Sequence, residues 1–170
     1  MKRIAVHLAA LCALPLLVAC ASGAPSNPST VAATNGIVSV ERFLQAASVQ
    51  DLDAMAQIFG TRDGPIAAET GSTLGCAFQR MGSWLRLSSR CRSWSDIDLQ
   101  MNALAQVLRH ENFDIRSESN VPGRANPAIR VGVDLTQDGE VYTDVPFVVV
   151  QARSGRWHIE EIGLSRVTGG

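Results

Sequence analysis

The pattern of apolar and polar positions predicts two consecutive helices at the start of the domain. In the first helix, apolar residues recur at intervals of three and four, at Val40, Phe43, Leu44 and Ala47. After a break at residues 48–50, the same spacing returns at Leu52, Met55, Ile58 and Phe59. This spacing is typical of amphipathic helices. Asp51 suits the N-cap of the second helix, and Gly60 suits its C-terminal end.

A third helix is predicted over residues 95–109. Its apolar stripe consists of Ile97, Met101, Leu104 and Leu108, with polar residues on the opposite face. Ser95, with Asp98 three residues later, resembles a capping pair. Acidic residues near the start and Arg109 near the end suit the two poles of the helix dipole.

After this helix the spacing of apolar residues changes from about 3.6 to 2, which predicts strands. Four strands are expected, over residues 113–121, 128–136, 140–152 and 156–164. The pairs Asp138-Gly139 and Ser154-Gly155 separate the last three strands and favour two-residue hairpin turns, so we expect antiparallel neighbours. Pro146 lies inside the third strand, which requires either a sheet edge or a bulge at that point.

These elements predict an α+β domain, residues 37–168, in which three N-terminal helices pack on a curved antiparallel sheet of about four strands. The stretch VERFLQAASVQDLDAMAQIFG resembles the opening of the nuclear-transport-factor-like cone fold, whose superfamily includes SnoaL-type polyketide cyclases and ketosteroid isomerases. The residues that carry this resemblance are Phe43, Leu44, Ala46, Asp51, Leu52, Met55 and Phe59.

The end of the domain, GRWHIEEIGL, is similar to the closing strand of that fold, where Trp157 and Ile159 would pack inward. The resemblance covers roughly residues 38–164 and implies a cone fold. It carries over no catalytic residue, because none of the pocket groups of the isomerases matches by position. Residues 61–93 depart from the family pattern, since this connection is longer than usual and contains two cysteines.

The N-terminus indicates a secretory leader. Lys2 and Arg3 precede an apolar run over residues 4–19, which is shorter than the roughly 20 residues of a membrane span. The run ends in Leu-Val-Ala-Cys at residues 17–20, which resembles the lipobox of bacterial lipoproteins, in which the cysteine is acylated and becomes the first mature residue. The alternative is an ordinary signal peptide, or an uncleaved anchor, that carries a cysteine by chance.

Acylation at Cys20 would moor the protein in a membrane of the cell envelope. Ala21 follows this cysteine, where lipoproteins of the inner membrane often have Asp, and this favours the periplasmic face of the outer membrane. Residues 20–36 would then be the lipidated cysteine and a flexible tether, since residues 21–36 are uncharged and mostly small. Such a tether extends to about 50 Å at most.

Charge argues against nucleic-acid binding. The chain has 15 Lys plus Arg and 16 Asp plus Glu, and removal of a leader that contains Lys2 and Arg3 makes the mature protein more acidic. A nucleic-acid-binding domain would instead need a basic surface.

The remaining cysteines, Cys76 and Cys91, are expected to form a disulfide in an oxidising compartment. A continuous helix over residues 77–90 would hold them about 20 Å apart, whereas a disulfide needs α-carbons within about 7 Å. Glycines and serines favour a bend in this segment, and the alternative is two buried thiols. Two cysteines alone do not make a zinc site.

A basic and aromatic patch is predicted around the same segment. It consists of Arg80, Trp84, Arg86, Arg90 and Trp94. Trp and Arg are enriched at interfaces, so this patch is a candidate contact for a partner or for anionic headgroups. The alternative, which we favour, is that the tryptophans fill the core and the arginines are solvated.

Polar residues at even-numbered strand positions form a candidate pocket. They are Asp134, Tyr142, Asp144, His158 and Glu160. A carboxylate beside a histidine is a candidate acid–base pair, although cross-strand polar pairs on a solvent-exposed sheet face give the same pattern, and we favour that interpretation. The sequence contains no phosphate loop, nucleophile elbow or histidine-rich metal motif, so we expect no cofactor and no metal.

The sequence therefore predicts a lipid-anchored cell-envelope protein that carries a small binding or interaction module. Its partners would be the membrane, through the N-terminal lipid, and a small apolar ligand or another envelope protein. The first alternative is a small-molecule enzyme of isomerase, cyclase or hydrolase type that uses Asp134, Asp144 or His158. The second is a purely structural subunit of an envelope complex.

Overall fold

The computed structural model describes residues 30–69 and 92–169. Several predicted sites lie outside these residues: Cys20, Cys76, Arg80, Trp84, Arg86, Arg90 and Cys91. The acylation site, the disulfide and four of the five residues of the basic and aromatic patch therefore stay predictions.

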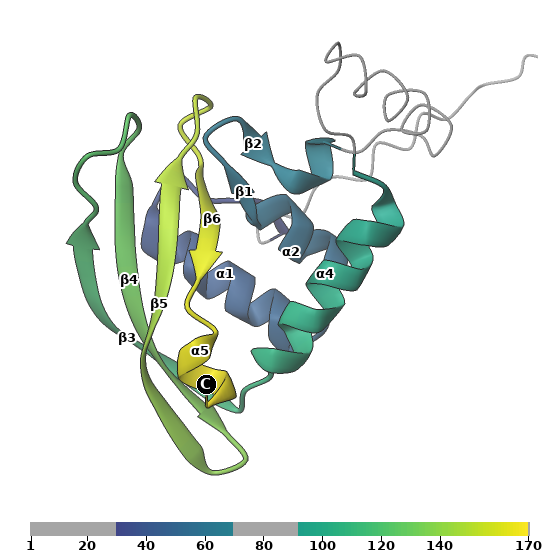
Figure 1. Ribbon diagram of the computed structural model, residues 1–170, viewed down its shortest axis with the longest axis vertical. Coiled ribbons are helices and arrows are strands. Elements are labelled where there is room, and N and C mark those ends of the chain that lie inside the picture. Colours follow the sequence, from purple (N-terminus) through teal and green to yellow (C-terminus); the bar gives the residue numbers. More distant parts are fainter. Residues whose placement is uncertain (1–29, 70–91, 170) are drawn as a thin grey trace, which may run out of the picture.

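A four-stranded antiparallel sheet forms one layer, and helices cover one of its faces (Figure 1). The strands follow the chain order, β3 (Asn112–Asn120), β4 (Ala128–Gln137), β5 (Glu140–Gln151) and β6 (Trp157–Ile162). The helices on the covered face are α1 (Gly36–Ser48), α2 (Leu52–Ile58) and α4 (Trp94–Val107). The predicted α+β class with a four-stranded antiparallel sheet is confirmed.

Four short elements also belong to the described structure. A two-stranded hairpin and a 3-10 turn follow α2, and one further helix follows the sheet: β1 (Gly60–Thr61), β2 (Gly64–Pro65), η2 (Ile66–Glu69) and α5 (Ser165–Thr168). Because α5 comes after β6, the helices do not all precede the sheet. The β1 strand lies beside β6, where Phe59 forms a parallel bridge with Ile159.

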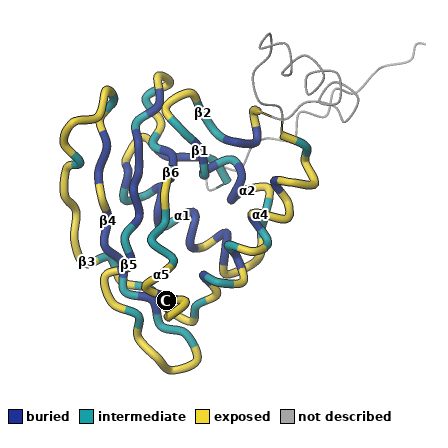
Figure 2. Tube along the Cα trace, viewed as in Figure 1, coloured by how far each residue is buried: buried dark blue, intermediate teal, exposed yellow. Residues whose placement is uncertain are grey.

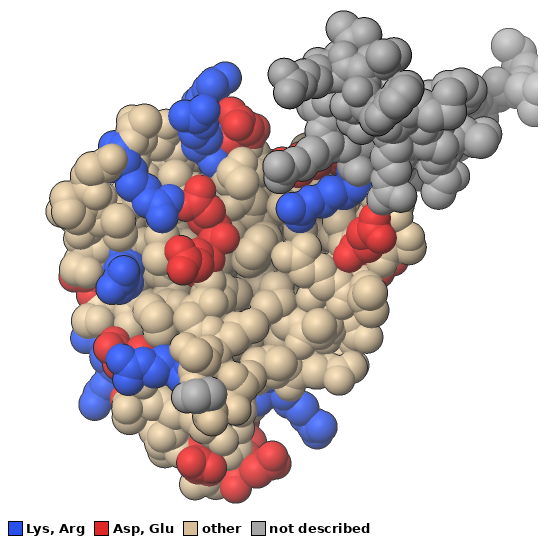
Figure 3. All heavy atoms as spheres, in the orientation of Figure 1, with Lys and Arg blue, Asp and Glu red and all other residues tan. Residues whose placement is uncertain are grey.

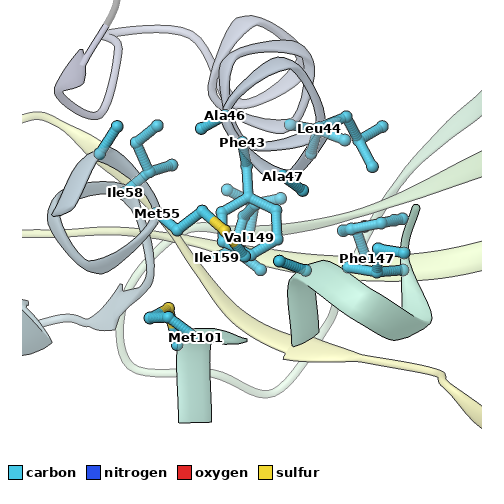
Figure 4. Close-up of a cluster of buried hydrophobic side chains, with 14 of the residues drawn as sticks. Phe43, Leu44, Ala46, Ala47, Met55, Ile58, Met101, Phe147, Val149 and Ile159 are labelled. Atoms are coloured by element: carbon cyan, nitrogen blue, oxygen red, sulfur yellow. The ribbon is translucent and has the colours of Figure 1, made fainter. Parts of the chain in front are cut away.

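The core lies between the sheet and the three helices. Phe43, Met55, Met101, Phe147 and Ile159 are all fully buried there and converge from α1, α2, α4, β5 and β6 (Figure 4). Figure 2 shows buried positions along β4 and β5 and exposed positions along β3, which is an edge strand. The apolar spacing in the sequence therefore identified the buried faces of α1 and β4 correctly.

Helix capping follows the predictions in one case and departs from them in another. The Asp51 side chain accepts a hydrogen bond from the Ala54 backbone N–H at 3.0 Å, which confirms the predicted N-cap. The capping box of α4 is formed by Ser93 and Asp96, so the predicted pair two residues later was wrong. Trp94 is already the first helical residue, which moves the cap toward the N-terminus.

Of the two predicted hairpin turns, one has the expected length. Asp138 and Gly139 both have positive φ, at 49° and 81°, as a two-residue turn between twisted strands requires. The second turn was predicted one residue too short. The Gly155 N–H donates to the Ala152 carbonyl, and the Ala152 N–H donates to the Arg156 carbonyl, so three residues form the loop and Gly155 takes the left-handed conformation at 81°.

Pro146 lies at a local sheet edge, which was one of the two predicted solutions. Pairing between β5 and β6 ends at Phe147 and Ile162. Beyond it, the Gly163 N–H donates to the Pro146 carbonyl at 2.8 Å. In an antiparallel strand, the N–H and C=O of a residue face the same neighbour, so the proline nitrogen faces Gly163, just beyond β6. The Gly163 carbonyl accepts instead from the Arg166 N–H at 3.3 Å, so it does not need a donor at position 146.

We expect Gly163→Ala to destabilise the domain by about 1–3 kcal/mol, because the new methyl group would overpack a rigid ring. A Cβ at this position would lie 2.5 Å from Pro146 Cγ and 2.8 Å from Cδ. Urea unfolding measures the change. In a Pro146→Ala background the ring is gone, so the same substitution should cost clearly less. An equal cost in both backgrounds would show that ring contact is not the cause.

Candidate functional site

Residues 31–35, which we expected to belong to the tether, are fixed on the folded domain, and we call them the strap. The Ala33 N–H donates to Ser39 Oγ at 2.8 Å, and the Trp157 N–H donates to the Ala33 carbonyl at 2.8 Å. Ala32 and Ala33 are 1% and 7% exposed. The strap therefore packs on the folded domain just before the boundary predicted at residue 37.

Two arginines from distant parts of the chain hold the strap in place. Arg42, on α1, donates from NH1 to the Val31 carbonyl at 2.9 Å. Arg156, just before β6, donates from NH1 to the Ala32 carbonyl at 2.8 Å. The strap has little apolar surface of its own and is held in place by two arginines that lie far from it in the sequence.

The strap and these two arginines enclose a hollow of about 570 Å³ that is open to solvent. Its lining consists of Val31, Ala32, Ala33, Thr34, Asn35, Val38, Arg42, Ser154 and Arg156. We call it the arginine hollow. It contains cationic, hydroxyl and apolar groups, and neither Asp nor Glu is among the described residues that line it.

The charges of Arg42 and Arg156 are not neutralised by carboxylates within the described part of the chain. By contrast, Arg62, Arg116 and Arg124 each form an ion pair. A guanidinium has five N–H donors, and each arginine of the hollow uses one of its terminal nitrogens on the strap. The remaining donors are available to a bound anion.

Two other hollows carry charges of both signs. One, of about 380 Å³, is bordered by Arg124 and Glu160, which form an ion pair with each other. The other, of about 500 Å³, is bordered by Arg109, Glu111 and Asp138. Cations and carboxylates also alternate across the face seen in Figure 3. An anion would therefore meet repulsive carboxylates at these two hollows.

The predicted pocket residues Asp134 and Asp144 meet on the outer face of the sheet, where they stabilise a β-bulge. Asp134 lies opposite two residues of β5, Thr143 and Asp144, and Asp144 has a positive φ of 54°. Asp134 Oδ1 accepts the Asp144 N–H at 2.9 Å, while Arg116 Nε lies 3.0 Å from Asp134 Oδ2. This carboxylate is engaged by backbone and guanidinium donors.

The same bulge moves Tyr142 to the other face, so the prediction that it shares a face with Asp134 was wrong. Tyr142 pairs with Leu135 and packs against the core cluster. Its hydroxyl donates to Glu140 at 3.2 Å, and this hydrogen bond raises the pKa of Tyr142. One extra residue in a strand is enough to exchange the faces.

His158 is buried, with only 2% of its surface exposed. It pairs with Val150 and faces away from the neighbouring core residue Ile159. Neither ring nitrogen has a hydrogen-bond partner among the described residues. Burial lowers the pKa of His158 below 6.5; the Ile58 backbone opposes this shift, and the Arg156 charge adds a smaller decrease.

The predicted pocket residues therefore do not line one common space. Glu160 pairs with Arg124, His158 is enclosed, and Tyr142 contacts the core. Trp94, the described member of the predicted basic and aromatic patch, is 42% exposed at the start of α4. The arginine hollow was missed because its two cations lie far apart in the sequence and belong to no spacing motif.

Within the described residues, no group of three or more potential metal ligands is close enough to hold an ion. None of the helices described there has the length and apolarity needed to cross a bilayer. Comparison of the chain with models of protein families, with curated proteins and with solved structures finds no match.

Proposed function

We propose that this chain is a lipid-anchored cell-envelope protein whose α+β domain is a binding or interaction module. The Leu-Val-Ala-Cys ending of the apolar run supports an acyl anchor at Cys20, and Ala21 favours the periplasmic face of the outer membrane. Between Cys20 and the strap lies a short uncharged segment, residues 21–30. The module would thus be held close to the lipid surface.

The observation that carries the binding role is the arginine hollow. It combines two cations that lack carboxylate partners among the described residues with hydroxyl and apolar groups in one open space. Sites of this size that combine apolar lining with a few polar groups are typical of ligand recognition. Catalysis is less well supported, because Asp134 is held in a bulge and Glu160 in an ion pair.

We also propose that the domain has a cone-type fold. Each of the three strand pairs in the sheet contains a bulge, which bends strands and increases their twist. A sheet bent in this way wraps around α1 and gives a conical interior. Three helices, α1, α2 and α4, come before the four-stranded sheet in the chain, which supports this proposal, while α5 follows the sheet.

The anchor is tested by labelling cells with a palmitate analogue and isolating the full chain. Wild type and Cys12→Ala should carry the label, because Cys12 lies within the leader that is removed. Cys20→Ala should carry none, since its acylation site is gone. Equal labelling of Cys20→Ala and wild type would refute the proposed anchor.

A further inference from the structure

We propose that the arginine hollow binds a phosphate group through Arg42 and Arg156. The two guanidinium groups line the same space, and neither forms an ion pair with a carboxylate of the described residues. Hydrogen bonds from a guanidinium to a phosphate oxygen are charge-assisted and about twice as strong as neutral ones. A phosphate would neutralise two cations that the described part of the fold leaves uncompensated.

The geometry fixes the arginines before a ligand arrives. Each of them already donates from NH1 to a strap carbonyl, at 2.9 Å for Arg42 and 2.8 Å for Arg156. This bond restricts the long side chain, so less conformational entropy is lost when the other donors bind an anion. Hydroxyl groups of Thr34 and Ser154 line the same hollow and can donate further hydrogen bonds to phosphate oxygens.

The rest of the lining favours a phosphate carried by an organic group over a bare ion. Val31, Ala33 and Val38 add apolar surface beside the cations. The volume of about 570 Å³ falls within the range of small-molecule sites, about 300–1,000 Å³. A phosphorylated small molecule and a phospholipid headgroup share the chemistry that this lining recognises.

A headgroup is within reach of the hollow if Cys20 is acylated, a condition that rests on the proposed function. Val31 follows Cys20 by 11 residues, which span at most about 40 Å when fully extended. The hollow would then stay near the bilayer that holds the anchor. Binding of a free phosphate compound does not depend on the anchor.

The test uses the wild-type full chain in an uncharged detergent and the arginine reagent phenylglyoxal. Labelling of each arginine is read by peptide mass spectrometry, in inorganic phosphate or in chloride at the same ionic strength. Phosphate at about ten times its dissociation constant should slow the labelling of Arg42 and Arg156 about tenfold. Arg130, which is exposed, is the internal control and should label equally in both. Equal labelling of Arg42 and Arg156 in both solutions would overturn the proposal.

Matched variants are compared by calorimetry with inorganic phosphate. Arg42→Gln/Arg156→Gln should weaken binding at least about tenfold, whereas Arg130→Gln should leave it unchanged. Unchanged affinity in the double variant would also overturn the proposal. The protection measured on the wild-type chain decides the question if the double variant does not fold.

The source of the phosphate is distinguished by reconstituting the wild-type chain into phosphatidylglycerol vesicles without free phosphate. Protection of Arg42 and Arg156 in the vesicles identifies the headgroup as the ligand. Protection by inorganic phosphate alone identifies a soluble phosphate compound. Failure of the palmitate labelling would remove the anchor but leave protection by inorganic phosphate intact, so the two proposals can fail separately.

Discussion

Phe43→Ala is expected to destabilise the domain by about 3–5 kcal/mol, the range for removing a large buried aromatic side chain. Phe43 is fully buried on α1, and its ring centroid lies 6.2 Å from that of Phe59. It points at the junction of α2 and the sheet, next to Met55 and Ile159 (Figure 4). The neighbouring side chains cannot easily fill the space left by the ring, because they are fixed on different elements, the helices and the sheet.

Urea unfolding followed by circular dichroism measures this loss. A domain of this kind has a total stability of about 5–15 kcal/mol, so the variant should lose a large part of it. The matched control is Val49→Ala, at a position that is 74% exposed just after the same helix, which should change stability by less than about 0.5 kcal/mol. If both variants unfolded at the wild-type urea concentration, the assignment of Phe43 to the core would be wrong.

The second large effect is expected to be a loss of stability in mild acid that depends on His158. Burial holds the pKa of His158 below 6.5 in the folded protein, whereas the unfolded chain has the ordinary value. As the pH falls below about 6.5, the unfolded chain binds a proton that the folded chain does not. Stability therefore decreases from that pH down to the folded pKa, with a slope of at most about 1.4 kcal/mol per pH unit.

Urea unfolding at pH 7.5 and at pH 5.5 tests this effect. His158→Leu removes the titrating ring from a site that is 2% exposed and where neither ring nitrogen has a partner among the described residues. Between the two pH values the variant should lose less stability than wild type, because it lacks the buried imidazole. The carboxylates are the same in both proteins, so their contribution cancels in the comparison. If the difference in unfolding free energy between wild type and variant were the same at both pH values, this would contradict the buried, neutral state of His158.

Periodicity predicted the elements well, because it reports burial along a single helix or strand. Phe43 on α1 and Met55 on α2 are buried as expected, and Leu52 is partly buried. Periodicity failed where a β-bulge places one extra residue in β5 opposite β4. The bulge opposite Asp134 depends on a positive φ at Asp144 and on a hydrogen bond between distant residues, and it moves Tyr142 to the core face without a local signal.

The candidate site was less predictable, because it also depends on contacts between residues that lie far apart in the sequence. Residues 31–35 lack the apolar surface that orders a segment by itself, so the sequence favoured a tether. Their order comes from Arg42 and Arg156, which meet only in the folded chain. His158 was identified as a candidate, but the alternation of polar and apolar positions predicted an exposed ring rather than a buried one.

The lipid anchor is tested most directly by the mass of the N-terminal peptide of the protein purified from membranes. We expect a mature chain that begins at Cys20 and carries the added mass of its acyl chains. A chain that retains residues 1–19, or one whose Cys20 is unmodified, would contradict the account of a module held at the surface of the envelope membrane.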